Sequence, residues 1–167
     1  MRYSSVSFGF TIIEIIVVVI IMLILMGVGI AGYNNFNQSQ VLKQTAEDIK
    51  SALRDAQNRA LTSEKDENIC TTALSSYDLD HWRFSITANN TYQISGSCGS
   101  LTFNTKTYKT PTNITLSPTS GNVDFKPLGQ GVTQGSLQTI TLISSVTLKK
   151  IDITITTSGN ITVGTIY

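Results

Sequence analysis

The sequence predicts an α+β fold in which a long N-terminal α-helix packs on an antiparallel β-sheet or small β-sandwich. Two observations lead to this prediction. Residues 15–31 carry no polar side chain, and apolar residues continue at helical spacing from Leu42 to Ala60. From Asp80 onward, apolar and polar residues alternate and Thr, Ile, Val and aromatic residues dominate, as is typical of strands.

The first expected element is an apolar helix over residues 10–32. A helix of this length is sufficient to cross a bilayer core of about 30 Å. The run is too long for an ordinary secretory signal, and no clear small-x-small cleavage site follows it. Glu14 near its start is anomalous, because a charge at bilayer depth costs roughly 2.5–3.5 kcal/mol. A plain membrane anchor leaves Glu14 unexplained, so we expect this carboxylate to have a partner.

The second expected element continues the helix over residues 33–62 with an amphipathic pattern. Its apolar positions alternate spacings of four and three, while charged residues occupy the opposite face. Such a seam fits either a coiled coil or a helix lying on a globular core. We favour the core, because three of the six positions are the small residue alanine. The seam consists of Leu42, Ala46, Ile49, Leu53, Ala56 and Ala60.

The remaining residues, 63–167, are expected to form a β-rich globular domain. Short apolar alternations are separated by turn-forming clusters such as Asn89-Asn90, and the three prolines fall at expected strand ends or edges. This pattern predicts several short antiparallel strands. The alternating positions are Trp82, Phe84 and Ile86, then Leu101 and Phe103, and finally Ile151, Ile153 and Ile155.

Two cysteines, Cys70 and Cys98, lie in this β-rich part. If the domain is exported to an oxidising compartment, a disulfide between them is the natural interpretation. It would close a loop of roughly 29 residues and stabilise the fold by on the order of 3 kcal/mol. The alternative is two unpaired buried thiols.

The composition favours no catalytic, cofactor or metal site. His81 is the single histidine, and next to Trp82 we expect it to be a structural or surface residue. Asp78, Asp80 and His81 are potential metal ligands, but a solvated turn explains them better. Two cysteines and one histidine are too few for a typical structural zinc site. We therefore expect a protein that is not an enzyme.

The charge balance gives no general reason for nucleic-acid binding. The 167 residues contain 12 Lys and Arg against 11 Asp and Glu, a formal net charge of +1. A local basic patch for DNA is conceivable, but we favour a solvated sheet face. The lysines concerned are Lys106, Lys109, Lys149 and Lys150.

The start of the apolar run resembles a known processing motif. Gly9-Phe10-Thr11-Ile12-Ile13-Glu14 looks like the prepilin motif of type IV pilins and type II secretion pseudopilins. The resemblance implies that residues 1–9 are a leader peptide, that a prepilin peptidase cuts after Gly9, and that Phe10 becomes the N-methylated first residue. The chain departs from the family at Phe8, where many members carry Lys or Arg.

The resemblance also implies a partner for Glu14. Cleavage creates a cationic amine on Phe10, and the pairing of this amine with Glu14 would relieve two costly charges. The amine can belong to the same chain or to a neighbouring subunit. If a neighbour supplies it, the ion pair also sets the register between subunits.

The second half shows a further resemblance to the GspH/FimT group of minor pseudopilins and minor pilins. Phe125, Pro127 and Gly129 stand at the places of a Phe-x-Pro-x-Gly-like stretch that joins two β-layers in that group. The resemblance implies a minor pilin or pseudopilin. Its implied partners are other pilin subunits, the prepilin peptidase, the inner-membrane assembly machinery and membrane lipid.

The implied location is the bacterial inner membrane, crossed once, with the C-terminal domain outside the cytoplasm, and afterwards the filament. The alternative is a single-pass membrane-anchored binding domain, such as a DNA receptor in competence. It predicts a monomer that stays in the membrane and tolerates the loss of Glu14.

Overall fold

The computed structural model describes residues 9–70, 78–133 and 135–167, and within residues 28–32 it describes the backbone alone. The chain divides into two compact units, Met1–Asn37 and Gln38–Tyr167.

One α-helix, α1 (Ile12–Leu61, 50 residues), continues from the first unit into the second. Its end is capped by the backbone. Ser63 adopts a left-handed conformation (φ 52°), and its N–H donates to the carbonyl of Ala60 at 3.1 Å. The N–H of Glu64 donates to the carbonyl of Arg59 at 2.9 Å, which satisfies a second carbonyl of the last turn. The helix bounds agree closely with the predicted range 10–62.

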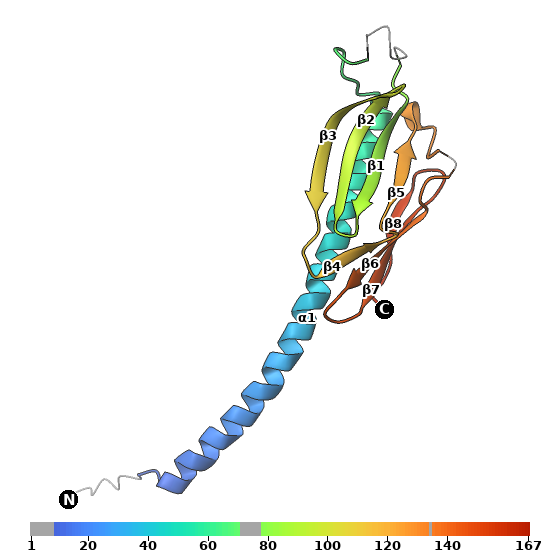
Figure 1. The fold of residues 1–167 in the computed structure, drawn as a ribbon. Helices are drawn as coiled ribbons and strands as arrows, with labels where there is room; N and C mark the ends of the chain where they lie inside the picture. Colours follow the sequence, from blue (N-terminus) through green and yellow to red (C-terminus); the bar gives the residue numbers. More distant parts are fainter. Residues whose placement is uncertain (1–8, 71–77, 134) are drawn as a thin grey trace, which may run out of the picture. The chain divides into compact units, whose positions relative to one another are not determined.

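The second unit also contains two four-stranded antiparallel sheets (Figure 1). Sheet A has the order β3-β2-β1-β5, and sheet B has the order β4-β6-β7-β8. The predicted α+β class with antiparallel sheets is therefore confirmed. The strands are β1 (His81–Ala88), β2 (Thr91–Cys98), β3 (Leu101–Lys109), β4 (Ile114–Ser117), β5 (Gly121–Phe125), β6 (Thr139–Ser144), β7 (Lys150–Ile155) and β8 (Ile161–Val163), with the 3-10 helix η1 (Pro127–Gly129) between β5 and β6.

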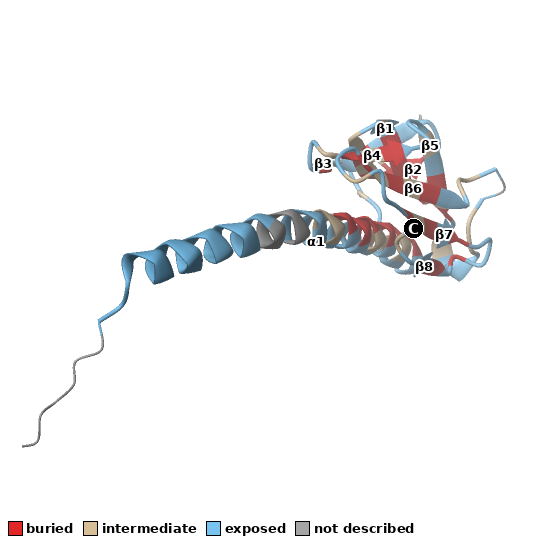
Figure 2. Cartoon of the chain, turned by 90° about the horizontal axis from the view of Figure 1, so that it is seen from below, coloured by how far each residue is buried: buried red, intermediate tan, exposed pale blue. Residues whose placement is uncertain are grey.

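The two sheets and the second half of α1 enclose one hydrophobic core (Figure 2). All six residues of the predicted seam from Leu42 to Ala60 are buried in it, so this part of the helix lies on a core as expected. Their spacing of four and three keeps them on one face of the helix, and small alanines allow close approach to the strands. The opposite face carries charged pairs such as Arg59 with Asp55 (3.0 Å).

All three predicted alternations fall on strands, namely β1, β3 and β7. Trp82, Phe84 and Ile86 of β1 and the three isoleucines of β7 are buried. Phe103 is buried too, but Leu101 is exposed, because it is the first residue of β3 at the margin of sheet A. The predicted turn Asn89-Asn90 joins β1 to β2.

The stretch Phe125 to Gly129 leads from sheet A toward sheet B. Phe125 is the last residue of β5 and is buried, whereas Pro127 begins η1. Leu128 adopts a left-handed conformation (φ 55°) and is exposed. The next strand along the chain, β6, belongs to sheet B, so this stretch connects the two β-layers.

Candidate assembly interface

The predicted cleavage site lies just outside the helix. Gly9 and Phe10 precede α1, both are exposed, and 79% of the Phe10 surface is accessible. A side chain added at Gly9 would meet no atom within 4 Å. The peptide bond between these residues is therefore accessible and is not held in helical hydrogen bonding. Residues 1–8 of the predicted leader lie outside the described residues.

Thr11 marks the boundary between this accessible peptide and the helix. Its Oγ1 accepts a hydrogen bond from the backbone N–H of Glu14 at 3.3 Å. Its carbonyl accepts from the N–H groups of Glu14 (3.1 Å) and Ile15 (3.3 Å). Thr11 is thus the N-cap of α1. The sequence interpretation missed this role, although Thr-x-x-Glu before an apolar run is the pattern of a capping box.

Glu14 is exposed in the first turn of α1. A carboxylate at this end is favoured by the helix dipole, typically by 0.3–1 kcal/mol on an exposed surface. Among the described residues Glu14 forms no ion pair. Its pairing with the amine of Phe10 therefore stays a prediction.

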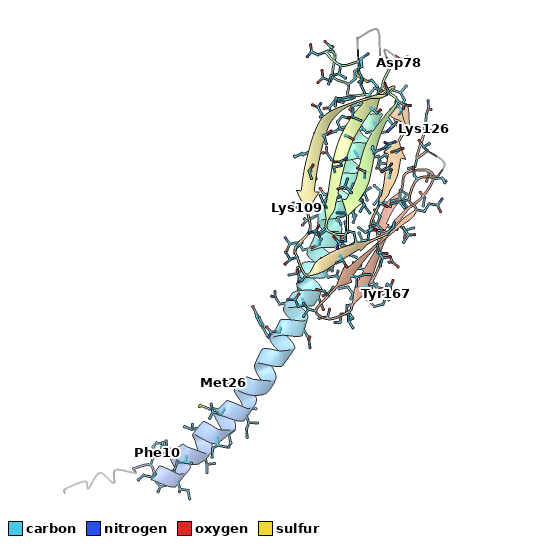
Figure 3. All side chains as sticks on the ribbon, viewed as in Figure 1. Phe10, Met26, Asp78, Lys109, Lys126 and Tyr167 are labelled. Carbon is cyan, nitrogen blue, oxygen red and sulfur yellow. A yellow bond between two sulfur atoms is a disulfide. The ribbon has the colours of Figure 1, made fainter. Side chains whose placement is uncertain are left out.

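From Ile15 to Met26 the helix presents apolar side chains on every face (Figure 3). Fifteen large apolar residues between Phe10 and Met26 have exposed fractions of 44–81%. A helix that is apolar all round is stable only in apolar surroundings. Removing these side chains from water would be favourable by on the order of 20 kcal/mol in free energy, at about 1.5 kcal/mol for each side chain. An apolar surface of this kind is typical of a helix that is buried in lipid or in protein.

In the part of the chain that the structure describes, no helix has the length and apolar character needed to cross a membrane. The predicted transmembrane segment 10–32 extends into residues 28–32, whose side chains lie outside the described residues. The membrane-spanning role of this segment stays a prediction.

A disulfide fastens the chain that follows α1 to sheet A. Cys70 and Cys98 are bonded (Cα–Cα 5.5 Å), and both are fully buried. Cys98 ends β2, and the indole N–H of Trp82 on β1 donates to the carbonyl of Glu64 at 2.9 Å. The guanidinium of Arg59 lies 5.0 Å from the centre of the Trp82 ring. These contacts hold the end of the helix against the sheet.

The polar residues near His81 form a structural ion-pair cluster. Arg83 of β1 faces Asp124 of β5 and donates two hydrogen bonds to its carboxylate, at 2.7 and 2.9 Å. The hydrogen bond to Asp124 is the main cause that raises the pKa of Arg83. His81 Nδ1 lies 3.0 Å from the carboxylate of Asp80. Within the described residues, no group of three or more side chains is arranged to hold a metal ion.

The four lysines of the conceivable DNA patch belong to different sheets. Lys106 and Lys109 are on β3 of sheet A. Lys149 lies in the turn between β6 and β7, and Lys150 is the first residue of β7. The strands β6 and β7 both belong to sheet B. Lys109 at the end of β3 is labelled in Figure 3.

Comparisons with protein-family models, with curated proteins and with solved structures find no significant match.

Proposed function

We propose that this chain is a minor pilin or pseudopilin. It is inserted in the bacterial inner membrane through residues 10–32 and cut by a prepilin peptidase after Gly9. It then joins a type IV pilus or a type II secretion pseudopilus through its N-terminal helix. Its work is architectural, with the helix packed among other subunits and the β-rich domain facing outward.

The observation that carries the proposal is the order of features at the start of α1. An exposed non-helical Gly9-Phe10 bond is followed by the Thr11 cap, by Glu14 and then by an all-round apolar helix surface. A peptidase needs the first feature, because substrate backbone must be free to enter its active site. An assembly helix needs the last, because its apolar side chains must move from lipid into contact with other subunits.

Glu14 fits this proposal on physical grounds. In water a carboxylate in the first helical turn costs nothing, but in lipid or in a filament core it costs several kcal/mol unless it is paired. Processing supplies a cation at Phe10, only four residues away in sequence. The ion pair then favours the incorporation of a subunit that has been processed and is in register with its neighbours.

The processing step is tested by intact-mass spectrometry after co-expression with a prepilin peptidase. The expected product is residues 10–167 carrying one added methyl group. Gly9→Val should remain full length, whereas Gly27→Ala, a change at another exposed glycine, should be processed normally. A wild-type chain that keeps Met1 beside an active peptidase would refute the proposal.

The assembly step is tested by Glu14→Ala. The variant should be processed and found in the membrane fraction but be largely missing from sheared filaments. Glu14→Asp keeps the charge and should restore part of the incorporation. Normal incorporation of Glu14→Ala would contradict the pairing and would favour the membrane-anchored binding domain instead.

A further inference from the structure

The turn between β6 and β7 presents an unusual amphipathic surface. We call Val146, Leu148, Lys149 and Lys150 the tip patch. Val146 and Leu148 are 61% and 75% exposed, and both lysines are exposed. No acidic residue occurs from 145 to 151. The patch therefore combines two accessible apolar side chains with two cations.

The tip patch is held in one conformation by local hydrogen bonds. The N–H of Leu148 donates to the carbonyl of Ser144 at 2.9 Å, and the N–H of Ser144 donates to the carbonyl of Lys149 at 2.9 Å. Ser145 donates through its N–H (2.9 Å) and its hydroxyl (3.2 Å) to the carbonyl of Asn113. Leu148 consequently adopts φ 57°, a left-handed conformation that is rare for leucine. Strain of this kind persists only where the surroundings impose it.

The turn is also fastened to the beginning of the second unit. Lys149 Nζ donates to Ser39 Oγ at 3.0 Å, and the amide of Asn113 donates to Gln38 Oε1. Figure 1 shows the β6–β7 turn beside this part of α1. Ser39 follows the end of the apolar run at Ala31 by eight residues, which span at most about 28 Å in any conformation. If the apolar run lies in a bilayer, this chain length allows the tip patch to approach the headgroups.

We infer that the tip patch docks on anionic lipid headgroups while the chain waits in the membrane, an inference that rests on the proposed function. Val146 and Leu148 enter the boundary between headgroups and acyl chains, and Lys149 and Lys150 contact lipid phosphates. Tyr167 exchanges two backbone hydrogen bonds with Lys150 and is exposed, which places an aromatic ring of the type enriched at membrane interfaces beside the patch. The docked turn orients the β-rich domain on the membrane before assembly.

The test uses the full chain in vesicles of phosphatidylcholine with phosphatidylglycerol. A fluorophore is attached at Val146→Cys, and headgroup-depth spin-labelled lipid is the quencher. The native cysteines are bonded to each other, so the introduced thiol is the labelled one. Leu128→Cys is the matched control, because Leu128 is also an exposed leucine (73%) with a left-handed backbone (φ 55°). Met22→Cys, near the middle of residues 10–32, reports whether the apolar helix is inserted, with a spin label on the lipid acyl chain as its quencher.

We expect quenching at Met22 and Val146 and none at Leu128. In the Val146→Cys background, Lys149→Gln and Lys150→Gln should each lower the ratio of docked to undocked turns about fivefold. The emission of Trp82 should stay unchanged in these variants, which shows that the domain is folded.

The possible failures separate the two proposals. Quenching at Met22 with Val146 equal to Leu128 overturns the docking inference and leaves the proposed function standing. No quenching at Met22 overturns membrane insertion and the inference with it. If the fluorophore at Val146→Cys is quenched equally in pure phosphatidylcholine, the assignment to anionic headgroups is overturned. It is also overturned if this fluorophore is shielded from water only in filaments and not in vesicles.

Discussion

Replacing Gly96 by alanine is expected to destabilise the β-rich domain, because the ring of Phe103 covers this glycine. Gly96 of β2 pairs with Trp82 on one side and with Phe103 on the other. A Cβ at Gly96 would lie 2.2 Å from Cζ of Phe103, whereas ordinary contact begins at 3.4 Å, so the ring must retreat by at least 1.2 Å. The ring is buried and meets Trp82 edge to face, with 5.5 Å between centroids. A movement of the ring would therefore disturb its contact with Trp82.

The expected net effect follows from two opposing terms. Overpacking a core position costs about 1–3 kcal/mol. Gly96 lies in a strand conformation that alanine can also adopt. Because alanine lowers the conformational entropy of the unfolded chain, the substitution also stabilises the folded state by about 0.4–1 kcal/mol. The free energy of unfolding should fall by about 1–2 kcal/mol in Gly96→Ala.

The assay is urea unfolding of the full chain in mild detergent, followed by circular dichroism and by the emission of the single tryptophan, Trp82. Phe103→Leu alone should also be destabilising, since it shortens a buried ring. In the double variant the two losses should not add, because the smaller side chain leaves room for the new methyl group. If the double variant is additive within about 0.5 kcal/mol, the proposed clash is wrong.

Three further predictions concern the disulfide, a buried tyrosine and the helix cap. Cys70→Ala with Cys98→Ala should lower the free energy of unfolding by about 3–4 kcal/mol for a loop closed across 28 positions, and an unchanged urea midpoint would contradict this. Burial raises the pKa of Tyr92 to about 12, so the folded state retains its phenol proton while the unfolded state loses it near pH 10, and stability should decrease between these values. Tyr92→Phe should weaken this decrease, as measured by urea unfolding at several pH values, and an identical pH profile would argue against burial as its cause. Thr11→Val should remove the cap at a cost of about 1 kcal/mol, seen as faster amide hydrogen exchange at Glu14, whereas unchanged exchange would contradict the capping role.

Much of the fold was predictable because the relevant signals are local. The apolar seam of α1 from Leu42 to Ala60 repeats at helical spacing, and the isoleucines of β7 alternate. These two periods predict both the type of each element and the face that it buries. The Thr11 cap was also predictable, because Thr11 and Glu14 stand at the spacing of a capping box before an apolar run. Alternation identifies the faces of a strand but not where a sheet ends, so it does not predict that Leu101 is exposed.

Some features of the candidate interface were also predictable from the sequence, and others were not. Gly9, Phe10, Glu14 and the apolar run are contiguous, so the proposed processing and assembly features could be found without coordinates. The tip patch could not be found, because no local pattern in the sequence shows that Val146 and Leu148 are both exposed. Only the β6–β7 turn, held by Asn113, brings Val146 and Leu148 to the surface.

By itself the sequence determined the α+β class, the extent of the helix and the motif at its start, since all of these depend on neighbours a few residues apart. The tertiary structure decided which strands share a sheet, that Arg83 faces Asp124 forty-one residues away, and that Phe103 covers Gly96. Such pairings depend on the register between distant strands. Register is set by the packing of the whole core, which no local pattern contains.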